Sequence, residues 1–149
     1  KSVTSAKKMR FGIVVSEWNP AITNALYKAA HTTLLKYGAK EKNIIRGLVP
    51  GSFELVLGAQ LIAENTTVDA ILCLGCVIQG ETRHFEFICQ AVAKGVVDLN
   101  IKYNKPVIFG VLTTDTYQQA KDRSGGKHGN KGEEAAMAAI KMVELKRSF

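Results

Sequence analysis

Four short apolar runs, continuous rather than alternating with polar residues, constrain the fold of this chain more than any other feature. They occupy residues 11–16, 43–49, 70–78 and 107–112. A strand that is apolar on both sides is buried on both faces, as in a parallel sheet with helices packed above and below it. The runs therefore predict a four-stranded parallel sheet.

A segment with helical spacing of its apolar residues follows each run. We predict helices at residues 20–37, 52–64, 84–102, 116–123 and 132–145. Asn19 and Pro20 suit the N-cap and first turn of the first helix, and Gly38 suits its end. Strands alternating with helices predict right-handed crossovers and a three-layer α/β/α fold. We expect one domain over residues 1–149, with a basic N-terminal segment at residues 1–10.

Composition and hydropathy exclude several classes of protein. Hydrophobic residues make up 46% of the 149 residues, enough to bury a continuous core. The longest apolar run, residues 70–78, is far shorter than the ~20 residues of a transmembrane helix, and the basic start has no signal-peptide pattern. These features favour a soluble cytoplasmic protein with no membrane partner.

Three cysteines without a disulfide framework fit a reducing compartment. Cys73 and Cys76 form a C-x-x-C pair, but they lie inside an apolar strand, where positions i and i+3 face opposite sides of the sheet. In thioredoxin-like proteins such a pair opens a helix instead. We therefore interpret both residues as buried structural thiols.

The net charge of +7 raises the question of a nucleic-acid partner, but the cations are spread along the chain without a reader motif. Scattered surface lysine is the simpler interpretation, and a small anionic substrate needs only one or two of these cations. Zinc-type Cys/His spacing and the G-x-G-x-x-G pattern are absent from the sequence. It therefore indicates no metal, no dinucleotide cofactor and no nucleic-acid partner.

Ligands of open parallel sheets bind beyond the carboxyl ends of the strands, so the segments after the four runs form the candidate site. After the first run, Trp18 and Asn19 stand at this edge. The indole of Trp18 can stack on a planar heterocycle, and from position alone it can equally pack down on the following helix. Both interpretations stay open.

After the second run, Pro50 and Gly51 form a turn that leads into a helix start at Ser52, Phe53 and Glu54. Glycine lets backbone approach a ligand, and the free amides of a helix N-terminus can donate to one. Glu54 by itself is better interpreted as an acidic residue that complements the helix dipole.

After the third run, Gly80 and Thr82 precede a helix start, an arrangement that suits an anion, although Thr82 can equally serve only as the N-cap. His84 stands in the first turn of that helix. The positive field there disfavours the protonated imidazole and keeps it usable as a base near neutral pH. A lone histidine is more often a surface residue, so both roles stay open.

Near the end of the chain, glycines lie among cations between Arg123 and Lys131. Asn130 and Gly132 flank Lys131, so the G-K-[ST] signature of a P-loop is absent. A glycine-rich turn between two helices is the simple interpretation, and the charges of Arg123 and Lys131 are the reason to consider an anion site.

Four segments together resemble the lumazine synthases of riboflavin biosynthesis: Val-Pro-Gly-Ser-Phe-Glu, Gly-Cys-Val-Ile-Gln-Gly-Glu-Thr-x-His, Pro-Val-Ile-Phe-Gly-Val-Leu-Thr and Gly-Asn-Lys-Gly-x-Glu. They occur in the family's order and spacing. The resemblance implies a flavodoxin-like fold without a cofactor, assembled as homo-oligomeric pentamers with active sites between adjacent subunits. The short segment at residues 124–132 resembles that of shell-forming members, which favours an icosahedral 60-subunit shell. Riboflavin synthase is a candidate partner.

The resemblance also implies roles for individual residues. Those expected to hold the pyrimidine ring and its ribityl chain within one subunit are Trp18, Asn19, Ser52, Phe53, Glu54, Val77 and Ile78. Those expected to bind the ketose phosphate are Gly80, Glu81, Thr82 and the neighbouring subunit's copy of Arg123. That neighbour is also expected to supply Phe109 and Lys131 to the pyrimidine, and His84 is expected to shuttle protons.

The implied transferase reaction condenses 5-amino-6-ribitylamino-pyrimidinedione with 3,4-dihydroxy-2-butanone 4-phosphate to 6,7-dimethyl-8-ribityllumazine. Because both small-molecule substrates are reactive, holding them together should outweigh acid–base chemistry. Departures from the family pattern are few: Val56 stands where proline is frequent, and Gln79 where a cation is common, with Arg83 as a replacement for that charge. The alternative is a catalytically weak, shell-forming scaffold of the same fold.

Overall fold

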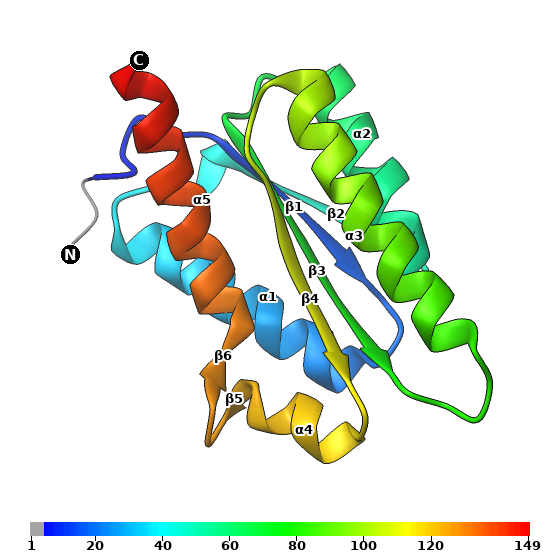
Figure 1. Ribbon diagram of the computed structural model, residues 1–149. Coiled ribbons are helices and arrows are strands. Elements are labelled where there is room, and N and C mark those ends of the chain that lie inside the picture. Colours follow the sequence, from blue (N-terminus) through cyan, green and yellow to red (C-terminus); the bar gives the residue numbers. More distant parts are fainter. Residues whose placement is uncertain (1–4) are drawn as a thin grey trace.

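A computed structural model describes residues 5–149 and shows a sheet between two layers of helices (Figure 1). The sheet has the order β2-β1-β3-β4, and every neighbouring pair is parallel. Its strands are β1 (Phe11–Ser16), β2 (Ile44–Val49), β3 (Ala70–Ile78) and β4 (Val107–Thr114). The predicted α/β class with a four-stranded parallel sheet is confirmed.

Four long helices cover the sheet, two on each face (Figure 1). One face carries α1 (Pro20–Lys36) and α5 (Lys131–Ser148), and the other carries α2 (Leu55–Asn65) and α3 (His84–Tyr103). Successive side chains of one strand enter the two cores in turn, since Ile13 lies in the core beside α1 and α5 and Val14 in the core beside α2 and α3. Both are fully buried, which is why the runs are continuous in the sequence.

Cys73 and Cys76 follow the same alternation. Cys73 lies in the core beside α2 and α3, and Cys76 lies in the core beside α1 and α5. Both thiols are free, and burial raises the pKa of Cys73 to about 12 and that of Cys76 to about 11. The interpretation as buried structural thiols is confirmed.

The start of α1 differs from the prediction in one respect. Pro20 is the first residue of the helix, but the side chain of Asn19 does not cap it. Asn19 has a φ of 60°, in the left-handed region that asparagine tolerates, and its Nδ2 donates to the Cys76 carbonyl at 3.5 Å. The amide therefore joins the start of α1 to β3. At the other end Gly38 has a φ of 104° and the predicted stop is confirmed.

The helix predicted at residues 52–64 is divided into two elements. Ser52–Glu54 form a separate 3-10 turn, η2, before α2, and a similar turn, η1 (Glu41–Asn43), precedes β2. The Gly51 N–H donates to Glu54 Oε1 at 2.9 Å and closes η2. Glu54 thus has a role within its own turn, as the sequence suggests. It fills that role by accepting a hydrogen bond from the Gly51 amide.

The segment after β4 is more ordered than a glycine-rich turn. Helix α4 (Tyr117–Asp122) is followed by an antiparallel hairpin of β5 (Ser124–Gly126) and β6 (Gly129–Asn130). Asn130 Oδ1 accepts from the Gly132 N–H at 2.8 Å and so caps α5. Gly132 packs against α1 so closely that a Cβ there would overlap the carbonyl of Leu26. The start of α5 is therefore held firmly beside α1.

The described part of the basic N-terminal segment packs onto the domain. Ala6 and Met9 are buried, and the Ala6 N–H donates to the Tyr37 carbonyl at 2.7 Å. Residues 1–4 of that segment lie outside the described residues. Among the helices of residues 5–149, none has both the length and the apolar character needed to cross a membrane.

Candidate active site

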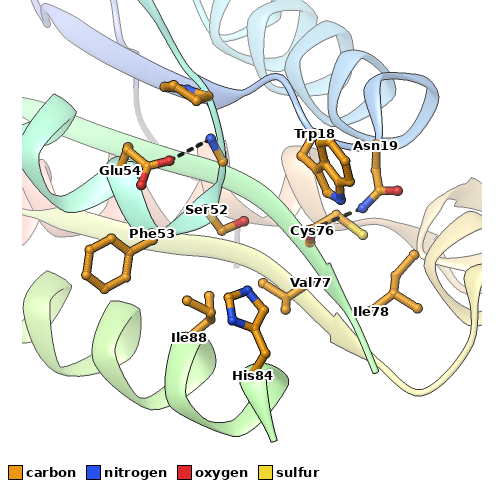
Figure 2. A pocket seen from close by; sticks show the side chains of 12 residues that line it. Trp18, Asn19, Ser52, Phe53, Glu54, Cys76, Val77, Ile78, His84 and Ile88 are labelled. Atoms are coloured by element: carbon orange, nitrogen blue, oxygen red, sulfur yellow. Dashed lines mark hydrogen bonds between the residues drawn. The ribbon is translucent and has the colours of Figure 1, made fainter. Parts of the chain in front are cut away.

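The carboxyl ends of β1, β2 and β3 border a cavity of about 600 Å³, here called the first cavity (Figure 2). It lies beside β1, which pairs with β2 on one side and with β3 on the other, so that the strand order reverses there. Such switch points are where α/β sheets bind ligands. Its walls are formed by Trp18, Asn19, Pro50, Gly51, Ser52, Phe53, Glu54, Cys76, Val77, Ile78, His84 and Ile88.

Two backbone hydrogen bonds hold the loop of Trp18 against the loop after β2. The Glu17 N–H donates to the Val49 carbonyl at 2.8 Å, and the Trp18 N–H donates to the Pro50 carbonyl at 3.1 Å. The Trp18 residue is 72% exposed, so its indole does not pack down on α1. It forms part of the cavity wall instead, with an aromatic face available to a planar ligand.

Ser52, Phe53 and Glu54 enter the first cavity from η2. Ser52 is buried, whereas the ring of Phe53 is more than half exposed at the rim. The hydrogen bond from Gly51 engages one oxygen of the Glu54 carboxylate and fixes its orientation. The turn therefore offers a ligand an aromatic ring and the second carboxylate oxygen, with the buried Ser52 hydroxyl beneath them.

His84 is the first residue of α3 and reaches the first cavity from the side opposite Trp18 (Figure 2). Its backbone N–H donates to Thr82 Oγ1 at 3.3 Å. Thr82 is not the N-cap that the sequence allows for, because Arg83 occupies that position and makes no side-chain cap. The hydroxyl of Thr82 instead steadies the turn that carries the imidazole.

The loop of Gly80, Glu81 and Thr82 is exposed and contributes no wall to the first cavity. The Gln79 N–H donates to the Thr114 carbonyl at 2.8 Å, and Gln79 Nε2 donates to the Gly80 carbonyl at 3.0 Å. These bonds place the start of the loop at the end of β4, beside a second group of site residues.

That second group surrounds a cavity of about 520 Å³ beyond β4, here called the second cavity. Its walls are formed by Val111, Leu112, Thr113, Thr114, Gln119, Arg123, His128, Lys131 and Glu134. Arg123 Nη1 donates to the Gln119 carbonyl at 3.1 Å, which orients the guanidinium and leaves most of its donors for an anion. Lys131 adds an ammonium at the N-terminus of α5, where the helix dipole also favours an anion.

The two cavities share no wall residue. Phe109 belongs to neither, because its ring packs on the core beside α2 and α3. Within one chain, then, the predicted pyrimidine residues of β1, η2 and β3 come together with His84, and Arg123 comes together with Lys131. Phe109 stays apart from both groups.

Comparison with known proteins agrees with this geometry. The family model described as 6,7-dimethyl-8-ribityllumazine synthase matches residues 8–147. A protein of that name from Cytophaga hutchinsonii is 65% identical over 133 residues, which are 89% of this chain and 84% of its own. Another from Bacteroides fragilis is 56% identical, over 92% of this chain and 96% of its own. This chain belongs to the lumazine synthase family.

The sequence motifs of the lumazine synthase family contain most of the predicted site residues. The structure adds other residues to the walls of the two cavities. Pro50, Cys76 and Ile88 complete the first cavity, and Gln119 and His128 complete the second. Ile88 lies four residues after His84 on the same face of α3, so helical spacing was an available signal. Gln119 and His128 had none, because only the folded hairpin brings them beside Lys131.

Proposed function

We propose that this chain catalyses the reaction that names its family. It condenses 5-amino-6-ribitylamino-pyrimidinedione with 3,4-dihydroxy-2-butanone 4-phosphate to 6,7-dimethyl-8-ribityllumazine, as a transferase of riboflavin biosynthesis. The observation that carries the proposal is the pair of cavities at one edge of the sheet. One has aromatic and apolar walls suited to a planar heterocycle, and the other has cations suited to a phosphate.

The pyrimidine occupies the first cavity. Trp18 stacks on the ring, and Val77 and Ile78 present backbone at the end of β3. Asn19, Ser52, Phe53 and Glu54 hold the ring and the ribityl chain, for which the carboxylate of Glu54 is an acceptor of hydroxyl protons. The fixed orientation of that carboxylate supports this assignment, since its hydrogen bond to Gly51 leaves one oxygen for the ligand.

The ketose phosphate occupies the second cavity. Arg123 binds the phosphate, while Gly80, Glu81 and Thr82 lie along the same substrate at the end of β4. Lys131 contacts the pyrimidine from this side, and Phe109, whose ring packs outside both cavities, contacts it as part of the neighbouring subunit's surface. A guanidinium that is already held by the Gln119 carbonyl loses little freedom when it binds an anion, which favours this role for Arg123.

The reaction starts when the aromatic amine attacks the ketone and water leaves to give an imine. Phosphate is then eliminated, the ribityl-bearing nitrogen closes the second ring, and a further water leaves. His84 accepts a proton at one step and returns it at another. Most of the acceleration comes from holding two reactive molecules in contact, because proximity can outweigh a single proton transfer by several orders of magnitude.

Each working site forms between two adjacent chains. The first cavity of one subunit faces the second cavity of its neighbour in a pentamer, and the short hairpin at residues 124–130 favours closure into a 60-subunit shell. The absence of shared wall residues supports this, because the two cavities of one chain then belong to different sites. We also propose the cytoplasm as the compartment, on the basis of the three free thiols, and riboflavin synthase as a partner.

The direct test is to incubate the purified protein with both substrates and to follow the fluorescence of the lumazine product. We expect product formation that depends on both substrates and far exceeds the spontaneous reaction. A folded, assembled protein that forms product no faster than buffer would overturn the proposal and favour the shell-forming scaffold.

The shared site has a separate test, which uses two chains that should each have little activity at ketose phosphate concentrations near the KM of the parent protein. A Glu54→Ala chain keeps the Arg123 half, and an Arg123→Ala chain keeps the Glu54 half. Equal amounts that are unfolded and co-assembled at random should regain both intact halves in roughly a quarter of the sites. Mixed rings, verified by mass spectrometry, that are no more active than their parents would show that both residues serve the same chain's site.

A further inference from the structure

Two buried serine hydroxyls, one of them from the wall of the first cavity, lack hydrogen-bond partners. Within residues 5–149, the buried side-chain polar atoms without a partner are Ser16 Oγ, Ser52 Oγ and His31 Nε2, and the last of these lies 2.7 Å from a carboxylate oxygen of Glu41. Ser16 is 0% exposed and Ser52 is 7% exposed. Because an unpaired buried hydroxyl destabilises the folded state, two of them together call for a functional explanation.

Both hydroxyls converge on Gly75 of β3. A Cβ built at Gly75 would lie 2.6 Å from Ser52 Oγ and 3.1 Å from Ser16 Oγ. Ser16 is the last residue of β1, and its neighbour Val15 pairs with Leu74 of β3, so Gly75 lies directly across the sheet from it. The missing side chain of Gly75 therefore makes the space in which the two hydroxyls lie.

The two serines differ in their access to a ligand. Ser52 is part of the wall of the first cavity, near Val77 and Cys76 (Figure 2), whereas Ser16 is not among the residues that form the wall. The wall of the first cavity thus includes Ser52 but not Ser16, and the Oγ atoms of both serines are buried in the free protein.

We propose that Ser16 is a positioning residue for the pyrimidine, which deepens the proposed function of the first cavity and rests on it. When the pyrimidine is bound, Ser52 donates to an oxygen of that substrate and at the same time accepts from the hydroxyl of Ser16. A hydroxyl has one donor and two acceptor sites, so Ser52 can do both. The bond behind it orients the Ser52 proton toward the substrate and polarises it.

This role predicts opposite effects on stability and on binding. In the free protein the Ser16 hydroxyl is an unsatisfied group, so Ser16→Ala should leave the melting temperature unchanged or raise it. The same substitution should raise the KM of the pyrimidine by about 5-fold, the size expected for one neutral hydrogen bond, and leave the KM of the ketose phosphate unchanged. If Ser16 had only a structural role, its replacement would lower the melting temperature and leave the KM of the pyrimidine unchanged.

A double-mutant cycle tests whether Ser16 acts through Ser52. Ser52→Ala should weaken the pyrimidine more than Ser16→Ala does, and adding Ser16→Ala to it should cause no further loss. Thr66→Val is the matched control, because Thr66 Oγ1 donates to the Ile62 carbonyl at 2.7 Å, far from both cavities. That change should lower the melting temperature without altering either KM.

The measurements are the two KM values, the melting temperature, and direct titration of the protein with 6,7-dimethyl-8-ribityllumazine. Additive losses in the cycle, or a Ser16→Ala protein that melts earlier and keeps its pyrimidine KM, would overturn the inference. The titration distinguishes a failure of the inference about Ser16 from a failure of the proposed function. If the unmodified protein binds the lumazine but forms no product, catalysis is excluded, and equal affinities of the parent and Ser16→Ala proteins would then reject the role of Ser16.

Discussion

The two cavities lie at the same edge of one sheet and differ in how they can hold a ligand. The walls of the first are mainly apolar and aromatic, with a single carboxylate and a single imidazole among them. The second is walled by Val111, Leu112, two threonines, the amide of Gln119, the imidazole of His128, the carboxylate of Glu134 and the cations of Arg123 and Lys131, and it opens at the N-terminus of α5. Stacking and desolvation therefore act in one cavity, and charge and the helix dipole act in the other.

This difference shows how one sheet can divide the recognition of two substrates. A planar ring gains most from a dry aromatic wall, whereas a phosphate gains most from guanidinium and ammonium groups that stay partly hydrated. Placing both sets of groups around one cavity would desolvate the cations. With the two sets at different strand ends, the cations of Arg123 and Lys131 do not line the first cavity of the same chain.

The largest effect should come from the second cavity. Arg123→Ala should raise the KM of the ketose phosphate by about 100-fold, because charge-assisted hydrogen bonds to the phosphate are lost, and it should change the KM of the pyrimidine little. Steady-state kinetics with each substrate varied in turn measures both values. Lys127→Ala is the charge-matched control, since Lys127 is exposed and lies outside both walls. Equal weakening of both substrates would make Arg123 a residue of the subunit contact.

His84 forms part of the wall of the first cavity, but its replacement should affect kcat rather than either KM. His84→Ala should lower kcat by about 20-fold, less than the ~10²–10⁴-fold that positioned proton transfer typically contributes, because proximity supplies most of the acceleration. Both KM values should stay within a small factor of those of the parent. His31→Ala, outside both cavities, is the control. A complete loss of turnover in a folded, assembled His84→Ala protein would place proton transfer above positioning.

The strands and the edge that carries both cavities were predictable because burial on both faces leaves a continuous apolar run. The same logic placed Cys73 and Cys76 on opposite faces. What the sequence did not show depends on contacts between distant segments. The left-handed conformation of Asn19 is coupled to a carbonyl of β3, and the hairpin between α4 and α5 depends on the packing of Gly132 against α1.

The candidate site was predictable to a similar extent. Trp18, Glu54 and His84 each follow a strand end, so the topology alone brings them together. Ser16 was overlooked because it belongs to an apolar run, where a serine carries no signal of its own. The role that we infer for Ser16 depends on Gly75 of the neighbouring strand, and no local sequence pattern connects the two residues.

A smaller effect should come from the aromatic wall of the first cavity. Trp18→Ala should raise the KM of the pyrimidine by about 10-fold, the low end of what stacking of one ring on an indole contributes, while Trp18→Phe should keep most of the affinity. The melting temperature should not change, since the indole is largely exposed. Tyr117→Ala removes an exposed aromatic ring outside both walls and should change neither KM. A larger effect on the ketose phosphate than on the pyrimidine would reverse the assignment of the two cavities.

The smallest effect concerns how dry the base of the first cavity is. Burial raises the pKa of the Cys76 thiol from 9.0 to about 11, so the unfolded chain releases this proton near pH 9 while the folded chain keeps it. Between those values the unfolded state binds fewer protons, so the free energy of unfolding falls as the pH rises, by roughly 1 kcal/mol for each pH unit from this group. Below pH 9 the thiol is neutral in both states and its contribution is fully present.

Urea unfolding at several pH values between 7 and 11 measures this slope. Cys76→Ala should flatten it relative to the parent, and Cys89→Ala should flatten it less, since Cys89 is only half-buried on α3 and burial raises the pKa of its thiol to a smaller extent. Comparing slopes rather than absolute stabilities removes the effect of the lost side-chain volume, which does not depend on pH. If Cys76→Ala kept the slope of the parent, water would reach the base of the first cavity. The two cavities would then differ in charge but not in hydration, and the proposed affinity of the first cavity for the pyrimidine would rest on stacking alone.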